Sequence, residues 1–519
     1  GYLNYQKIFD IHNISVTAGY ERQMQTRETR FMYAQTFSSD VQRTDNMGEG
    51  EDNVTIGTYK NEWSLAGYFS RINYVLNDKY ILTFNARLDG SSKFGADNKW
   101  GFFPSGAVAW RLSEEDFIKN LNFFDQLKLR TSYGSTGNGE IGVYLSQGTW
   151  RIQGFQYSFD GVLANAAYLN RLANPGLKWE STRQFNVGLD IGVLRNRIRL
   201  TADYFHKKTV DLILPKGIPI STGFNSATVN QGSLVNNGFE VATDMVVLDQ
   251  TLRWDIGANL SFYRAKPTDL GDDEWITVNS HVKLPGLRLE VDKPTGLITG
   301  PVLLGVFKDQ EDADSYPQST GLPNEPGLYK LMDVDGDRRV TSNDWAYIGN
   351  GSPNFVYGFN TSVAWKSFDL NAFFQGTYGN ELVWYVAGGR NTESDITSVT
   401  RADGRTNNLT AVYKDYYSEQ NTDATYMKPH YQRGVDHPAI YDGSYFRLKA
   451  LTIGYNLPKI KWIRSARIFF TGQNLFTITN YPGYNPDVTS KGERAFGEGH
   501  DTGSYPLSRS YLFGINLGL

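Results

Sequence analysis

The fold is decided by the stretch Tyr80-Ile81-Leu82-Thr83-Phe84-Asn85-Ala86-Arg87-Leu88-Asp89. Every second residue from Tyr80 to Leu88 is apolar, whereas four of the five intervening residues are polar or charged. Successive side chains of a β-strand point to opposite faces, so this pattern predicts a strand with one apolar face and one wet face. Its length of about ten residues matches a tilted strand that crosses a bilayer, and is nearly twice the length usual in soluble sheets.

The same alternation recurs along the chain, at residues 185–191, 254–262, 355–365 and 511–519. It predicts an all-β protein, a transmembrane antiparallel β-barrel with about fifteen strands. Single-chain bacterial barrels have even strand numbers, and residues 1–8 resemble the second half of a hairpin. We therefore expect residues 1–519 to form the C-terminal portion of a larger barrel.

The predicted connections alternate between short turns and long loops. A mid-sized link, residues 113–125, contains Ser113-Glu114-Glu115-Asp116 and predicts a capped helical turn. The long loops are predicted near residues 135–181, 265–353, 380–443 and 476–508. Outer-membrane barrels combine tight periplasmic turns with long external loops in this way. A soluble β-sandwich or propeller, the alternative, should have similar loops at both ends.

The composition excludes several other classes of protein. The formal net charge is only -4 and Lys and Arg are not clustered, which argues against a nucleic-acid partner. No Cys is present, so disulfide and thiolate chemistry are excluded. The sequence contains no run of about 18 apolar residues, so no transmembrane helix is predicted. The first residues do not form a signal sequence, so either one has been removed or the chain is a fragment.

Several blocks, spread from end to end of the chain, resemble the SusC-like TonB-dependent transporters of the SusC/RagA family. They include Leu88-Asp89-Gly90-Ser91-Ser92-Lys93-Phe94-Gly95, Trp100-Gly101-Phe102-Phe103-Pro104-Ser105, Asn174-Pro175-Gly176-Leu177-Lys178-Trp179-Glu180, Asn237-Gly238-Phe239-Glu240, Tyr445-Phe446-Arg447-Leu448-Lys449 and Gly472-Gln473-Asn474-Leu475-Phe476. In physical terms these blocks are structural, because they contain glycines at bends, aromatic residues at membrane interfaces and polar residues facing a wet lumen.

The resemblance implies a barrel of 22 strands that encloses an N-terminal plug, a segment that contacts TonB, and a SusD-like surface lipoprotein as a lid. We expect this chain to supply about 15 of those strands without the plug, so TonB contact would come through the missing N-terminal part. The implied function is active import of an oligosaccharide, or of a peptide, across the bacterial outer membrane. Two alternatives remain: a soluble carbohydrate-binding or glycan-active β-protein, and a structural or adhesive barrel that transports nothing.

One stretch suggests metal chemistry. Residues 333–344 place carboxylates at positions 1, 3, 5 and 12 of a twelve-residue loop, the oxygen spacing that a calcium ion requires. The predicted ligands are Asp333, Asp335, Asp337, Arg339 through its carbonyl, Thr341 and Asp344. Against calcium, position 6 is Arg338 rather than Gly, and Asp344 is one methylene shorter than the usual Glu. The alternative is an acidic solvated turn.

No catalytic arrangement is apparent, since the six histidines are scattered without paired spacing, and we predict that the chain is not an enzyme. Aromatic side chains in the long loops are candidates for stacking on sugar rings, although such residues also anchor their own loops. The candidates are Trp150, Tyr157, Trp179, Trp384 and Tyr385.

Overall fold

The computed structural model describes residues 1–39, 41, 45–151, 156–165, 167–278, 286–319, 323–384, 414–428, 440–458, 463–488, 499–501 and 504–518. Its largest sheet has fifteen strands, in agreement with the number expected from the alternation. In sheet order these are β1 (Tyr2–Phe9), β2 (His12–Phe37), β3 (Gly50–Leu76), β4 (Tyr80–Ser91), β5 (Trp100–Arg111), β6 (Phe124–Asn138), β11 (Glu180–Val193), β12 (Ile198–Val210), β15 (Ser233–Asp249), β16 (Leu252–Asp269), β25 (Phe355–Trp365), β26 (Phe368–Tyr378), β29 (Tyr445–Asn456), β30 (Ser465–Thr479) and β32 (Ser510–Gly518).

The order of strands in this sheet follows the order in the sequence, so each strand pairs with the main-sheet strands before and after it. The connections alternate as predicted between short turns, such as residues 77–79 and 366–367, and long segments, such as residues 270–354. Among the described helices, none has both the length and the apolar character needed to cross a membrane.

The chain divides into two compact units. The first comprises residues 1–114, 129–187 and 207–233, and the second comprises residues 115–128, 188–206 and 234–519.

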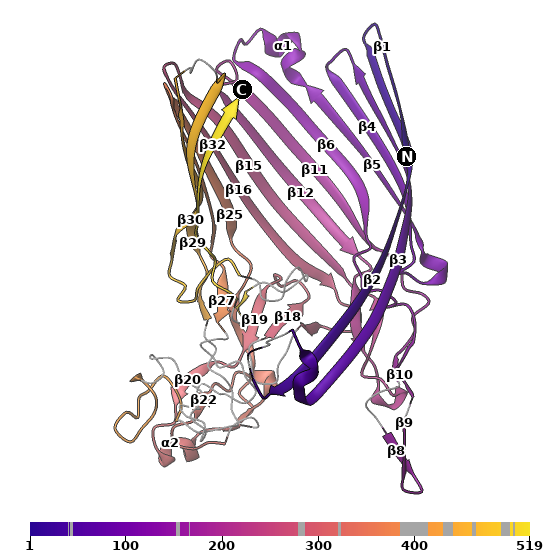
Figure 1. The fold of residues 1–519 in the computed structure, drawn as a ribbon, viewed down its shortest axis with the longest axis vertical. Helices are drawn as coiled ribbons and strands as arrows, with labels where there is room; N and C mark the ends of the chain where they lie inside the picture. The colour runs from indigo at the N-terminus through magenta and orange to yellow at the C-terminus, as the bar shows by residue number, and fades with distance from the viewer. Residues whose placement is uncertain are drawn as a thin grey trace. The chain divides into compact units, whose positions relative to one another are not determined.

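In the first unit, β1 to β5 lie side by side (Figure 1). Tyr80 pairs with Trp110 and Leu88 with Phe102, which places the apolar positions of β4 and β5 on one face. That face is exposed, as expected of a surface that contacts lipid: Phe84 and Phe102 are 51% and 61% exposed. The opposite face is polar, and there the Asn85 amide donates to the Ser105 hydroxyl at 3.1 Å. The predicted two-faced strand is therefore confirmed.

Aromatic residues mark both ends of the apolar face on β5. Trp100 and Trp110 lie ten residues apart, so their Cα atoms are about 33 Å apart along the strand. At a tilt of about 40° this corresponds to a height of about 25 Å, the thickness of the apolar band of an outer-membrane barrel.

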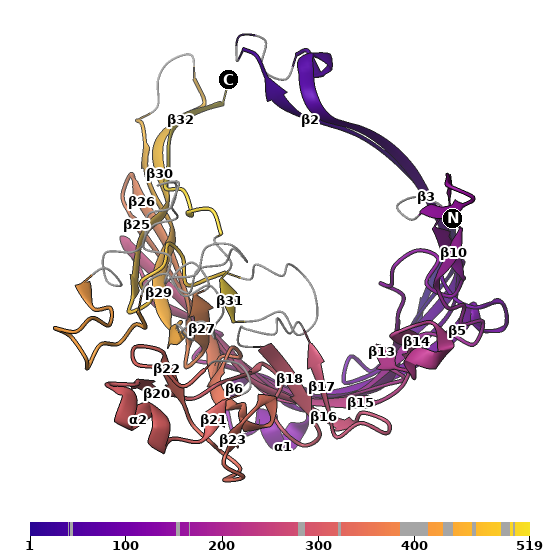
Figure 2. The same ribbon diagram turned by 90° about the horizontal axis from the view of Figure 1, so that it is seen from below.

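The second unit contains β16, β25, β26, β29, β30 and β32 of the main sheet, and the last five form a curved row in Figure 2. Smaller sheets lie in its long loops. One contains β17 (Trp275–Val278), β18 (Gly286–Glu290), β19 (Leu297–Gly300) and β24 (Ala346–Asn350); another pairs β20 (Leu303–Val306) with β22 (Tyr329–Leu331); a third contains β27 (Glu381–Trp384), β28 (Ile440–Asp442) and β31 (His500–Asp501).

The predicted helical turn in residues 113–125 is present as α1 (Asp116–Lys119). The predicted cap was wrong, however. Ser113 lies in a 3-10 turn, and the residue that precedes the helix is Glu115, whose side chain makes no capping hydrogen bond. A single helical turn in a tight connection is held by the strands on either side, so it does not depend on a cap.

Close packing in the first unit generates a prediction. Gly95 donates its backbone N–H to the Leu177 carbonyl at 3.0 Å, and a Cβ added to Gly95 would lie 1.7 Å from the Pro175 carbonyl oxygen. We expect Gly95→Ala to lower the free energy of unfolding by about 1–3 kcal/mol, because backbone must move. Gly217→Ala, which meets nothing within 4 Å, should change it by less than about 0.5 kcal/mol. Denaturant unfolding followed by Trp fluorescence measures both, and equal effects would contradict the packing argument.

Candidate functional site

The predicted metal-binding loop, residues 333–344, is anchored at both ends in one apolar cluster. Leu331, which precedes the loop, and Val340, at its eighth position, are both buried, and they pack with Tyr329 and Val306. Val340 also belongs to β23 (Arg339–Val340), which pairs with β21 (Gln318–Ser319). The loop therefore extends from a packed base.

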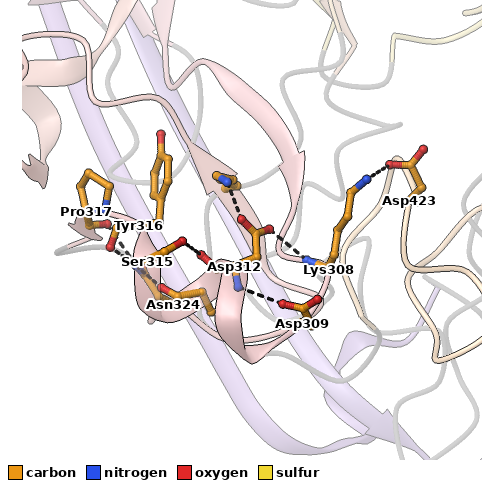
Figure 3. Close-up of polar contacts among 10 residues, drawn as sticks. Lys308, Asp309, Asp312, Ser315, Tyr316, Pro317, Asn324 and Asp423 are labelled. Carbon is orange, nitrogen blue, oxygen red and sulfur yellow. Dashed lines mark hydrogen bonds and ion pairs between the residues drawn. The ribbon is translucent and has the colours of Figure 1, made fainter.

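The base is reinforced beside α2 (Gln310–Ser315), as Figure 3 shows. Asp309 accepts a hydrogen bond from the Asp312 backbone N–H at 2.9 Å and so caps the helix. Asp312 pairs with Lys330 Nζ at 2.6 Å, and this ammonium holds the pKa of the Asp312 carboxyl below its usual range. Asn324 lies within 3.2 Å of the carbonyl oxygens of residues 313, 316 and 317, and thereby closes the turn after the helix. Because Lys330 belongs to β22, these contacts fix the strand that leads into the loop.

Three of the predicted ligands lie together. One carboxylate oxygen from each of Asp333, Asp335 and Asp337 lies within 4.8 Å of the others. Each carboxylate also accepts a backbone N–H within the loop: Asp333 from Gly336 and Arg338, Asp335 from Asp337, and Asp337 from Arg339, at 2.7–3.0 Å. The arrangement concentrates negative charge on a wound loop, which is the chemistry that a hard divalent cation requires.

Arg338 occupies the sixth position, where a glycine is usual because the backbone turns sharply. Its φ is +67°, in the left-handed region, so the loop makes this turn despite the side chain. The departure at Arg338 therefore does not alter the course of the backbone.

The carboxylate of Asp344 is buried and hydrogen-bonded to the loop's own backbone, a contact that the prediction did not include. It is 2% exposed, and its two oxygens accept backbone N–H groups from Val334 at 2.8 Å, Asp335 at 3.3 Å and Thr341 at 2.7 Å. The Thr341 hydroxyl, another predicted ligand, accepts from the Asn343 N–H at 3.0 Å. Among the described Asp, Glu, His and Cys side chains, the three that come close enough to share an ion are Asp333, Asp335 and Asp337. The short side chain of Asp344 binds the loop's own backbone, and the role of Asp344 and Thr341 as further ligands stays a prediction. Arg339 donates its backbone N–H to Asp337 at 2.7 Å, and its carbonyl stays a predicted ligand.

The environment of Asp344 makes the loop sensitive to acid. Burial alone would raise the pKa of this carboxyl, but the hydrogen bonds from Thr341, Val334 and Asp335 outweigh it and hold the pKa below its usual range. A carboxyl whose pKa is lowered on folding stabilises the fold above the unfolded value, near pH 4, and loses that contribution as the pH falls through the folded value.

We expect Asp344→Asn to open the loop locally, because the amide presents an NH2 group to backbone donors. Amide hydrogen exchange across residues 333–341 should accelerate by about tenfold to a hundredfold, as a loss of about 1–3 kcal/mol implies. The same loss of protection, measured relative to the intrinsic exchange rate at each pH, should appear in the unaltered protein as the pH falls below about 4. Asn343→Ala is the control, since this exposed side chain makes no hydrogen bond to the described chain. Unchanged exchange in Asp344→Asn would exclude a closing role for Asp344.

The candidate sugar-binding aromatics differ in their environments. Trp150 lies in β7 (Thr149–Arg151), which pairs with β10 (Tyr168–Arg171), and its side chain is 68% exposed. Tyr157 lies in β8 (Gln156–Phe159), which pairs with β9 (Val162–Asn165), but its side chain is outside the described part. Tyr385 also lies outside the described residues.

Trp179 was predicted as a stacking residue, and the structure shows an anchor instead. Its ring is 8% exposed and packs against Phe94 at 4.6 Å and Phe103 at 5.6 Å between ring centroids. Its indole N–H donates to the Lys99 carbonyl at 2.9 Å. No face of this ring is free for a sugar, so the assignment of Trp179 to substrate is corrected.

Trp384 ends β27 and is half-buried among Tyr441 and Tyr481, with ring centroids 6.0 Å and 6.2 Å away. Tyr481 donates to the Asp501 carboxylate at 2.7 Å, which fixes the ring. Burial together with this bond raises the pKa of Tyr481 well above its usual range. Trp384 therefore belongs to a rigid aromatic group and presents only part of its surface.

Sequence reasoning did not identify Arg447, which holds the segment after β30 in place. Arg447 is 1% exposed, and its guanidinium donates to Thr477 at 2.9 Å, to Asp487 at 3.1 Å and to Asn485. A buried guanidinium is stable only with such partners, so Arg447 ties the segment after β30 to β29. Arg447 lies in one of the blocks that resemble the family, but the residues that pair with it lie 30–40 positions away and gave no local signal.

The comparison with known families places these features in context. Residues 2–289, more than half of the chain, match the family model described as TonB dependent receptor-like, beta-barrel. The chain belongs to this receptor family. It is an outer-membrane protein that crosses the membrane with its strands, as the sequence predicted.

Relatives of this receptor chain extend the match to its whole length. It is 33% identical to TonB-dependent receptor P3 of Formosa agariphila over 99% of the chain and 51% of that protein. It is 30% identical to TonB-dependent receptor SusC of Bacteroides thetaiotaomicron over 88% of the chain and 44% of that protein. These names are those of receptors, in agreement with the prediction of a protein that is not an enzyme. The chain thus spans about half the length of these relatives.

A solved structure supports the fold independently. The structure of the RagAB peptide transporter superposes with a TM-score of 0.77, over 99% of this chain and 54% of that one, at 23% sequence identity. The expected likeness to SusC-like transporters of the SusC/RagA family is therefore confirmed.

Proposed function

We propose that this chain forms part of the wall of a transporter that imports an oligosaccharide across the outer membrane by a TonB-dependent mechanism. The observation that carries the proposal is the 33% identity to a TonB-dependent receptor over 99% of the chain. The one-sided distribution of long loops supports it, because an importer must capture its substrate on the external side. Contact with TonB would come from the part of the relatives' length that this chain does not match.

The proposed partner at the external side is a SusD-like lipoprotein that acts as a lid over the long loops. The likeness to SusC and to the RagA-containing structure supports this partner. A peptide is the alternative substrate, since RagAB is described as a peptide transporter. The two substrates differ in what they require of the loops: a sugar ring is bound by an exposed aromatic face, and a peptide by backbone pairing.

Trp150 supports the oligosaccharide. Its indole is largely exposed, and no ring contact or hydrogen bond joins its side chain to the rest of the described chain. The pairing of β7 with β10 holds its backbone in place. With the backbone held, only the two side-chain torsions of Trp150 remain to be fixed when a sugar stacks on the ring, so the entropy loss is small.

The import proposal is tested by growth. We expect a strain that lacks the complete gene to lose growth on at least one oligosaccharide of a defined panel, and to regain it on complementation. Trp150→Ala should raise the half-saturating substrate concentration roughly twofold to tenfold, as the loss of one stacking contact implies. Trp150→Phe should retain most of the affinity, and Val162→Ala, an exposed apolar residue of β9, serves as the control.

The outcomes separate the candidates. Growth on every oligosaccharide but loss of growth on peptide mixtures would favour the peptide. Normal growth of the deletion strain on both would overturn import and favour a structural or adhesive role. Full complementation by Trp150→Ala would remove the stacking role of Trp150 and leave import itself untouched.

We also propose that Asp333, Asp335 and Asp337 bind a calcium ion that stiffens the external loop. The close approach of the three carboxylates and the turn at Arg338 support this role. The engagement of Asp344 with the backbone leaves fewer protein ligands than a complete calcium loop has, so the affinity should fall in the weak range of extracellular modules, with a Kd of about 0.1–1 mM.

Calorimetric titration of the purified protein with calcium tests the site. We expect saturable heat that Asp335→Ala removes and that Asp273→Ala, an exposed loop carboxylate outside the cluster, leaves unchanged. No heat in the unaltered protein, or equal heat in the Asp335 variant, would show that residues 333–344 form an acidic turn without an ion.

A further inference from the structure

A groove lies on the apolar outer face of the first unit. It has a volume of about 510 Å³ and crosses four strands, β4, β5, β6 and β11. Its lining residues include Phe84, Phe102, Tyr133, Ser135, Ser181 and Arg183. Phe84 pairs with Gly106, in the same alternating set as Tyr80 and Trp110, so the groove is on the face that contacts lipid.

The groove exists because small residues alternate with large ones. Gly106 forms part of its floor, and a Cβ added there would meet a single atom, the Thr83 carbonyl oxygen, at 3.9 Å. Its walls are the side chains of Phe84, Phe102 and Tyr133, which are 51%, 61% and 59% exposed. An apolar channel open along a membrane-facing surface has the chemistry of a site for an acyl chain, because each CH2 group that packs into it buries apolar surface.

The part of the groove on β11 and β6 is polar. The hydroxyls of Ser135 and Ser181 lie 3.0 Å apart, which shows that these residues share a face. Arg183 follows Ser181 in the same alternating set, which continues as Phe185, Val187 and Leu189. On the other face of β11 the Asn186 amide donates to Ser132 at 3.0 Å. Arg183 therefore points away from that polar face and toward the lipid side.

Arg183 is exposed, and nothing in the described chain neutralises it: it makes neither an ion pair nor a hydrogen bond there. Other arginines of the same unit are paired, such as Arg87 with Asp89 at 2.6 Å. An unpaired arginine on the lipid face is destabilising at the bilayer midplane and is tolerated near the interface. Arg183 is the fourth residue of β11, close to the strand end that joins the long loop 139–179.

We propose that this groove binds a membrane lipid with a phosphate-bearing, anionic headgroup. The headgroup phosphate accepts from the Arg183 guanidinium and from the Ser135 and Ser181 hydroxyls, and one acyl chain lies along Phe84, Phe102 and Tyr133 above Gly106. Charge complementarity selects this occupant, since the guanidinium carries a fixed positive charge and, together with the two hydroxyls, can donate hydrogen bonds to phosphate oxygens. The proposal concerns the outer wall and does not depend on what the protein imports.

Native mass spectrometry of the complete protein, purified in detergent, tests the site. Phosphatidylglycerol and phosphatidylcholine with identical acyl chains are added separately. The unaltered protein should retain phosphatidylglycerol at least fivefold more tightly than phosphatidylcholine, because a choline group opposes the guanidinium. This comparison needs no variant, and equal retention of the two lipids would overturn the proposal.

Variants then locate the site. Arg183→Gln should weaken phosphatidylglycerol binding about tenfold, Arg183→Lys should retain part of it, and Gly106→Leu should weaken both lipids by filling the groove. Arg253→Gln is the matched control, because that arginine pairs with Asp255 at 2.9 Å. A folded membrane barrel resists SDS until it is heated, so a heat-dependent shift in gel mobility reports whether each variant is folded. Unchanged binding in folded Arg183→Gln, or an equal loss in Arg253→Gln, would show that Arg183 simply extends its guanidinium to interfacial water.

Discussion

The pairing of backbone N–H and C=O groups between neighbouring strands is the constraint on which the rest of this structure depends. Inside a bilayer no water is available to these groups, so each must find its partner on an adjacent strand. The ladders of β3 with β4 and of β4 with β5 meet this requirement without interruption from Tyr80 to Gly90. Because the ladder satisfies the backbone, the side chains on one face can contact lipid while those on the other face contact water. The strict alternation of Phe84 with Asn85, one exposed on the apolar face and one bonded to Ser105, is the result.

The long loops cannot rely on that ladder and are stabilised by small apolar cores of their own. In the first unit, Phe94, Leu177 and Trp179 form such a core, and Gly95 permits the close approach of the two segments that supply it. In the second unit, Leu328, Tyr329 and Val340 do the same beneath the aspartate loop. The consequence for function is that a loop aromatic is either an anchor or a contact surface. Trp179 is buried and Trp150 is exposed, so within the first unit the two roles are divided between different rings.

The sequence predicted the main sheet well because membrane strands carry a local signal of period two that no distant contact overrides. It predicted the aspartate loop for a similar reason, since Asp333, Asp335 and Asp337 interact with backbone only two to five residues away. Prediction from the sequence failed for residues whose role depends on partners far away in the chain. Trp179 and Lys99 are 80 residues apart in the chain, and Arg447 finds Thr477, Asn485 and Asp487 across a strand and a loop. The backbone contacts of Asp344 were not predicted for a geometric reason: a short carboxylate at the twelfth position reaches the backbone of the loop, and the spacing alone does not show this.

Three arginines show how far environment, rather than residue type, determines what a charge does here. Arg87 lies on the polar face of β4, where Asp89 and Glu21 pair with it. Arg447 is fully buried, and the cost of its desolvation is offset by three partners, which makes it a structural tie. Arg183 is exposed on the apolar face beside Phe185 and has no partner in the described chain, which leaves its charge accessible to water or to an anion. Strand alternation alone separates Arg87 from Arg183, because moving either residue by one position along its strand would transfer its side chain to the opposite face of the sheet.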